Sequence, residues 1–179
     1  MIEQEAFELP PQISLKSPNN KYLSVESNGH IKAASEHILS WELLNVIQTK
    51  YEYGIKTCFM NLGEENKERF IGIDVAHMWH DEYGSYDKVH IVAVEKSKAE
   101  QWEVEFLGND EIALKSTMGH PEMYLGEEPI FHKLMLVSKD IGHDETWTFE
   151  PNPVLQNNLT SSESKPLRRV YSKIKKSIK

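Results

Sequence analysis

Short runs of alternating apolar and polar residues recur along the chain and predict β-strands. In Ile13-Ser14-Leu15-Lys16 the isoleucine and leucine fall on one face, and the serine and lysine on the other. Turn-forming residues separate these runs, as in Pro18-Asn19-Asn20 and Gly108-Asn109-Asp110. The pattern predicts an all-β chain.

Four such runs follow one another in the same order three times. The copies cover residues 13–17, 22–26, 31–34 and 41–44, then 54–57, 70–74, 90–93 and 102–105, then 112–116, 124–127, 134–137 and 147–150. The last run of each copy begins with a tryptophan: Trp41, Trp102 and Trp147. Twelve strands in three equivalent units predict a closed barrel with a hairpin cap, the β-trefoil. An irregular β-sandwich with repeats by chance is the alternative.

The composition changes after residue 152, which divides the chain into three predicted parts. The trefoil spans residues 1–152, and residues 153–164 form a predicted linker, because the stretch 157–164 is mostly polar and serine-rich. Residues 165–179 form a basic tail without an acidic residue. Apolar side chains in the tail recur at helical spacing, which predicts a short basic amphipathic C-terminal helix; they are Leu167, Val170, Tyr171, Ile174 and Ile178.

Charge is distributed unevenly between the body and the tail. The chain has 28 acidic and 20 basic residues, a net charge of −8, and 39% of its residues are hydrophobic. Residues 1–164 hold 13 basic against 28 acidic residues, or −15, and the tail carries +7. An acidic body disfavours specific nucleic-acid binding, so we expect contact with a polyanion only at the tail. The alternative is that the tail folds back on its own acidic body.

The sequence of the three copies resembles that of fascin-like β-trefoils, which include the hisactophilins. The resemblance rests on Ile-x-Leu-Lys-Ser at 13–17 and 112–116, on Tyr-Leu at 22–23 and 124–125, and on the tryptophan of each last run. It implies binding to actin filaments. Ricin-type trefoils carry Gln-x-Trp near the end of each repeat. In this chain the residues two positions before the tryptophans are Leu39, Glu100 and Glu145. The sequence therefore disfavours a ricin-type lectin.

These features predict a non-enzymatic, cofactor-free protein that binds actin filaments, or another anionic protein surface, through the trefoil surface and the tail. The predicted contact residues are Lys165, Arg168, Arg169, Lys173, Lys175, Lys176 and Lys179 for charge, with Val170, Ile174 and Ile178 as an apolar face. The alternative is a peripheral adaptor whose basic helix binds an anionic membrane or a protein. A third hypothesis is a metal-binding or enzymatic protein that uses the loop 75–87, which contains His77, His80, Asp81 and Glu82.

The second copy is longer than the others, with extra residues between Cys58 and Arg69 and in the aromatic-rich loop 75–87. Cys58 is the single cysteine, and we expect a buried, inert thiol. One cysteine and an acidic N-terminus without a signal-peptide pattern favour a cytoplasmic protein. Lys16, Lys56 and Lys115 share one position in the copies, where we expect solvent-facing side chains rather than a binding triad.

Overall fold

The computed structural model describes residues 7–52, 54–63, 67–74, 89–117, 122–127 and 134–152. In these ranges the chain forms antiparallel β-strands and a single 3₁₀ turn, η2 (Lys96–Lys98), which confirms the predicted all-β class. None of the helical structure found there is long and apolar enough to cross a membrane. The loop 75–87, the predicted linker and the predicted C-terminal helix lie outside the described residues.

Each strand is short, as the alternation of apolar residues predicts. The strands are β1 (Gln12–Lys16), β2 (Tyr22–Val25), β3 (Ile31–Ser35), β4 (Leu44–Tyr51), β5 (Gly54–Asn61), β6 (Arg69–Ile73), β7 (Val89–Val94), β8 (Glu103–Gly108), β9 (Glu111–Lys115), β10 (Tyr124–Glu127), β11 (Leu134–Ser138) and β12 (Trp147–Pro151).

Six of these strands close into a ring. Neighbours pair in the order β1, β4, β5, β8, β9 and β12, and β12 pairs with β1. The contact between β5 and β8 is a single bridge, in which the backbones of Thr57 and Trp102 exchange hydrogen bonds of 2.9 and 2.8 Å. Closure pairs the outermost strands with each other and so leaves the ring without an open sheet edge.

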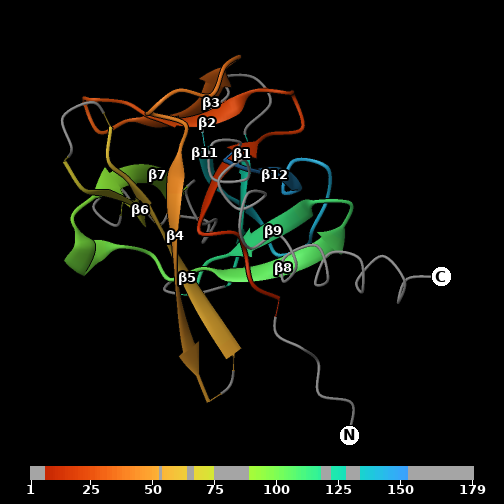
Figure 1. Cartoon of the computed structure of the whole chain (residues 1–179). Helices are drawn as coiled ribbons and strands as arrows, with labels where there is room; N and C mark the ends of the chain where they lie inside the picture. The colour runs from red at the N-terminus through yellow and green to blue at the C-terminus, as the bar shows by residue number, and fades with distance from the viewer. Residues whose placement is uncertain are drawn as a thin grey trace, which may run out of the picture.

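Three hairpins, β2–β3, β6–β7 and β10–β11, extend from the ring. Strand β7 also pairs with β11, and an isolated bridge joins Val92 of β7 to His30, directly before β3, so the hairpins contact one another. Figure 1 shows β2–β3 at the top of the molecule and the long β4–β5 hairpin projecting from the opposite end. This projecting hairpin carries the exposed side chain of Tyr51.

The apolar core fills the ring, and the alternating residues point into it. Ile13, Leu15, Ile112 and Leu114 are all inaccessible to solvent, as the alternation predicts. Burial of each such side chain contributes roughly 1.5–3 kcal/mol to folding. Ser14 is buried as well, although the alternation places it on the opposite face from Ile13 and Leu15.

The predicted equivalence of the three tryptophans is wrong for Trp41. Trp102 and Trp147 are fully buried, and the indole N–H of Trp147 donates to the carbonyl of Leu125 at 3.0 Å. Trp41 instead lies in the turn before β4 and is half-buried. Leu44, three residues later, is fully buried and is the first residue of β4. The leucine takes the core position, and the tryptophan is left at the surface.

A buried glutamate stands two residues before each of these core positions: Glu42, Glu100 and Glu145. The carboxylate of Glu42 accepts a hydrogen bond from the backbone N–H of Leu39 at 2.9 Å, and that of Glu145 from Gly142 at 2.9 Å. A carboxylate that accepts backbone N–H groups stabilises a turn that would otherwise bury unpaired donors. The contact of Glu42 shapes the turn on which Trp41 lies.

Candidate functional site

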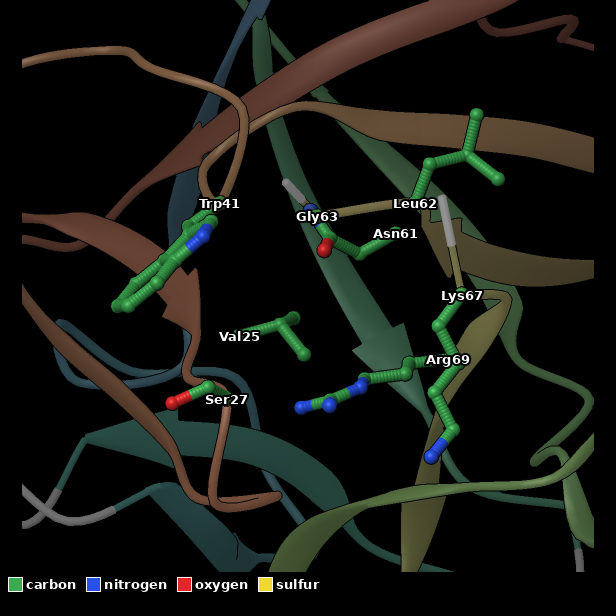
Figure 2. Close-up of a pocket in the computed structure, with 8 residues that line it drawn as sticks. All are labelled: Val25, Ser27, Trp41, Asn61, Leu62, Gly63, Lys67 and Arg69. Carbon is green, nitrogen blue, oxygen red and sulfur yellow. The ribbon is translucent and has the colours of Figure 1, made fainter. Parts of the chain in front are cut away.

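A pocket of about 240 Å³ opens between the end of β2, the turn before β4, and the segment that joins β5 to β6. Figure 2 shows Trp41 on one side of this space and the arginine of β6 reaching in from the other. Its lining consists of two apolar side chains, one indole, two cations, two small polar or amide groups and a glycine: Val25, Leu62, Trp41, Lys67, Arg69, Ser27, Asn61 and Gly63.

Backbone and side-chain hydrogen bonds hold the turn that carries Trp41. The carbonyl of Trp41 accepts from the backbone N–H of Val25 at 3.0 Å. The side-chain amide nitrogen of Asn61 donates to the carbonyls of Ser40 and Leu43, at 2.8 and 2.9 Å. Because these bonds lie on both sides of Trp41, they hold the backbone from which the indole projects into the pocket.

Asn61 also brings an unpaired acceptor to the pocket. The residue is fully buried, and its carboxamide oxygen has no donor in the part of the chain that the structure describes. Figure 2 shows this oxygen facing the space between Trp41 and Arg69. Leaving a buried acceptor unpaired costs about 1–3 kcal/mol, which a ligand hydroxyl at this point would offset.

Arg69, the first residue of β6, supplies a positive charge. One guanidinium N–H donates to the backbone carbonyl of Glu26 at 2.6 Å, which directs the side chain across the pocket towards Val25 and Ser27. The carboxylate of Glu26 pairs with Lys32 instead, with Nζ and Oε1 2.6 Å apart. Arg69 is therefore fixed by a neutral carbonyl and keeps its charge available to the pocket.

Together these groups form a site with one flat apolar face, one buried acceptor and two cations. An indole face packs against flat apolar surfaces, and convergent polar groups then set orientation and specificity. None of the eight lining residues, within the described part of the chain, carries a carboxylate. The site can hold a small polar molecule that has both an apolar face and hydroxyl groups.

The three lysines at one position of the copies are ion-paired on the barrel. Lys16 lies 3.1 Å from Glu150, Lys115 lies 2.9 Å from Glu103, and Lys56 also pairs with Glu103. Hydrogen bonds from Lys56 and Lys115 lower the pKa of Glu103, and Glu103 in turn raises the pKa of Lys115. Because acidic partners compensate these lysines, they do not form a basic face for an anionic filament.

The described residues contain neither a reactive site at Cys58 nor a cluster that could bind a metal ion. Cys58 lies within β5, partly buried, and burial raises the pKa of its thiol, which disfavours a reactive thiolate. No group of three or more histidine, cysteine or acidic side chains is placed to hold a metal ion in the ranges that the structure describes. The loop with His77 and His80, and the ten predicted tail contacts, lie outside those ranges.

The sequence alone did not predict this pocket. Trp41 was predicted to be a fold residue, and Ser27, Asn61, Lys67 and Arg69 were not predicted to bind a ligand. One signal was present, because the far wall of the pocket coincides with the extra residues between Cys58 and Arg69. A second signal was that Trp41 and Leu44 are both large apolar residues near one core position. Only one of them can occupy that position.

Known proteins share the fold rather than the sequence of this chain. No protein-family model matches it, and no curated protein matches it. A ricin B-like lectin from Macrolepiota procera, solved in complex with lactose, superimposes with a TM-score of 0.58 at 11% identity and covers 82% of this chain and 100% of the lectin. An exo-β-1,3-galactanase from Clostridium thermocellum gives a TM-score of 0.59 at 10% identity, over 81% of this chain and 32% of the galactanase.

The fold is β-trefoil-like. This confirms the trefoil part of the resemblance, whereas nothing in the comparisons indicates a fascin or hisactophilin family. The prediction of an actin-filament-binding protein is wrong, because the structures that share the fold are described as a lectin and a galactanase, and neither as a filament-binding protein. The ion pairs of Lys16, Lys56 and Lys115 give a physical reason. The alternative of an anionic-lipid or protein adaptor is also without support.

Proposed function

We propose that the protein is a carbohydrate-binding protein whose sugar site is the Trp41 pocket. The observation that carries the proposal is the pairing of a half-buried indole with a buried acceptor that lacks a donor within the described residues, Asn61 Oδ1. A pyranose offers an apolar face of C–H groups for the indole and hydroxyl donors for the amide oxygen. The lactose complex of the similar lectin supports the same class of ligand.

We propose a non-catalytic role for the pocket. General acid–base chemistry on a glycosidic bond needs two carboxyl groups that flank the bond. The described lining of the pocket offers cations, an amide and a hydroxyl in their place. The galactanase match supports a shared fold and not a shared catalytic activity, because this chain corresponds to about a third of that enzyme.

We also propose that the chain contains three structural repeats and belongs nearer to ricin B-like than to fascin-like trefoils. The recurrence of a buried glutamate two residues before Leu44, Trp102 and Trp147 supports three repeats. An experimental structure of the full chain tests this, since the three units must superimpose under threefold rotation. Units that do not superimpose would contradict it.

A cytoplasmic location remains a proposal that rests on the single cysteine, Cys58. Imaging of a C-terminal fluorescent fusion in the native cell type tests it. Diffuse signal in the cytoplasm is the expected result, and signal confined to the cell exterior or to an organelle would contradict it.

The binding proposal is tested by a glycan array and by titration calorimetry on the full chain. We expect binding to galactose-containing glycans, with lactose as the first probe, and loss of binding in Trp41→Ala. Trp41→Phe keeps an aromatic face and should retain part of the affinity. Tyr51→Ala is the matched control, because Tyr51 is an exposed aromatic on the β4–β5 hairpin and does not line the pocket. Equal binding by Trp41→Ala and wild type would contradict the proposal.

A further inference from the structure

The charge of the pocket narrows the class of sugar. Lys67 and Arg69 both line it, and they come from the same short segment at the start of β6. No lining residue in the described part of the chain opposes them with a carboxylate. Within the described lining, both ionised groups are therefore cationic, although residues 1–164 carry a net charge of −15.

Three acidic residues of the described chain adjoin pocket residues in the sequence, and none of them lines the pocket: Glu42, Glu68, which is exposed between Lys67 and Arg69, and Glu26. Glu26 adjoins the pocket residue Ser27, but its carboxylate contacts Lys32 and only its backbone carbonyl contacts Arg69. A guanidinium has five N–H donors, of which the bond to Glu26 uses one. Arg69 is thus both held in place and left with donors for a ligand.

We propose that the pocket binds a carboxylated saccharide, a uronic acid residue whose carboxylate meets Arg69 and Lys67 while its ring packs against Trp41. The inference rests on the proposed function and specifies its ligand class. A ring hydroxyl donates to Asn61 Oδ1, which faces the space between Trp41 and Arg69 in Figure 2. The pocket volume of about 240 Å³ accommodates one sugar residue.

A carboxylate suits this site better than a sulfate ester, which has the same charge. The planar guanidinium matches a planar carboxylate through two parallel N–H···O bonds, and lysine adds a point charge. A sulfate ester presents tetrahedral oxygens to the same donors. The experiment therefore compares a carboxylated sugar with a sulfated one.

The test compares four methyl glycosides by titration calorimetry on the full chain: galactose, galacturonate, the methyl ester of galacturonate, and sulfated galactose. The ester has nearly the shape of the acid but no charge. We expect galacturonate to bind about tenfold more tightly than galactose or the ester, which is typical of a hydrogen bond to a charged group. The advantage should decrease as salt rises.

Variants assign the effect to the pocket. Arg69→Gln should remove most of the tenfold preference for galacturonate, and Lys67→Gln should reduce it. Lys50→Gln is the matched control, because it removes one positive charge from an exposed residue of β4 outside the pocket. Circular dichroism establishes that each variant is folded before the comparison.

Each outcome separates this inference from the proposed function. Equal binding of galacturonate, its ester and galactose would overturn the inference and leave sugar binding in place. Tighter binding of the sulfated sugar would overturn the carboxylate assignment. Retained preference in Arg69→Gln would overturn the assignment to this pocket. If none of the glycosides binds and the glycan array is also blank, both proposals fail.

Discussion

The guanidinium of Arg69 donates a hydrogen bond of 2.6 Å to the backbone carbonyl of Glu26 and so joins the start of β6 to the turn after β2. This bond connects the two walls of the pocket, which lie more than forty residues apart in the sequence. It also means that one side chain has two roles, in the fold and in the site.

The structural role of Arg69 predicts a modest loss of stability on truncation. Arg69→Met keeps much of the aliphatic stem and removes the bond to Glu26, so we expect the free energy of unfolding to fall by about 1 kcal/mol. Urea denaturation of the variant and wild type measures this. Lys67→Met, which removes a charge from an exposed residue of the same segment, should be nearly neutral. Equal stability of Arg69→Met and wild type would contradict the role of the bond.

The tryptophans should separate into one binding residue and two core residues. Trp147→Ala removes a fully buried ring and its hydrogen bond to Leu125, so we expect a loss of about 3–5 kcal/mol. Trp102→Ala should behave alike. Trp41→Ala should cost about 1 kcal/mol or less, because the indole is half-buried. Thermal and urea unfolding distinguish these values, and a large loss in Trp41→Ala would place that ring in the core.

Glu103 predicts an acid-dependent contribution to stability. Lys56 and Lys115 hold its pKa below the usual 4.5, so the folded state favours the ionised carboxylate. The contribution is therefore present above pH 4.5 and is lost as pH falls through the lower pKa of the folded state. Glu103→Gln should cost about 1 kcal/mol or less at neutral pH, because the side chain is partly exposed.

Urea unfolding of wild type and Glu103→Gln across the acidic range measures that difference. The difference should shrink as the pH falls below 4.5. Glu52→Gln, at an exposed position of the β4–β5 turn, is the control. A stability difference that does not change with pH would show that the two lysines do not favour the ionised form.

The phenol of Tyr124 should titrate well above pH 10. Burial, followed by its hydrogen bond to Glu105, raises its pKa to about 12. A raised pKa means that the protonated phenol stabilises the fold below pH 10, and that this stabilisation is lost as pH rises towards 12. An absorbance titration of tyrosinate should show one late step that is absent in Tyr124→Phe. A curve that the substitution leaves unchanged would contradict the assignment.

The strand pattern was predictable because it depends on neighbours in the sequence. Alternation placed Ile112 and Leu114 in the core correctly, since a strand with one buried face repeats every two residues. Trp41 was wrongly assigned to the core because residues 41–44, Trp-Glu-Leu-Leu, have an apolar residue at each end. The pairing of β4 with β1, which begins at Leu44, decides between them, and a single segment does not contain that information.

In the first copy, the comparison with the ricin-type Gln-x-Trp pattern used the wrong residue. Because Trp41 was taken as the core residue, Leu39 was compared in place of Glu42. In the structure the carboxylates of Glu42 and Glu145 accept a backbone N–H from three residues earlier. In this fold an acidic side chain at that position therefore stabilises the turn.

The pocket could not be predicted, because its walls come from separate segments that only the fold brings together. Asn61 joins the far wall to the turn of Trp41 through its bonds to the carbonyls of Ser40 and Leu43. Arg69 joins the same wall to the turn after β2 through its bond to the carbonyl of Glu26. None of these three bonds leaves a pattern within one segment of the sequence. The extra residues between Cys58 and Arg69 marked where the site lies but not what it binds.

The most direct test of the account is an NMR titration of the isotope-labelled full chain with a galactose- or galacturonate-containing oligosaccharide. The proposal predicts saturable shifts at the indole N–H of Trp41 and at the backbone amides of Ser27 and Gly63, with those of Glu103 and Glu111 unchanged. No saturable shift with either sugar, or shifts confined to residues outside the pocket, would contradict it.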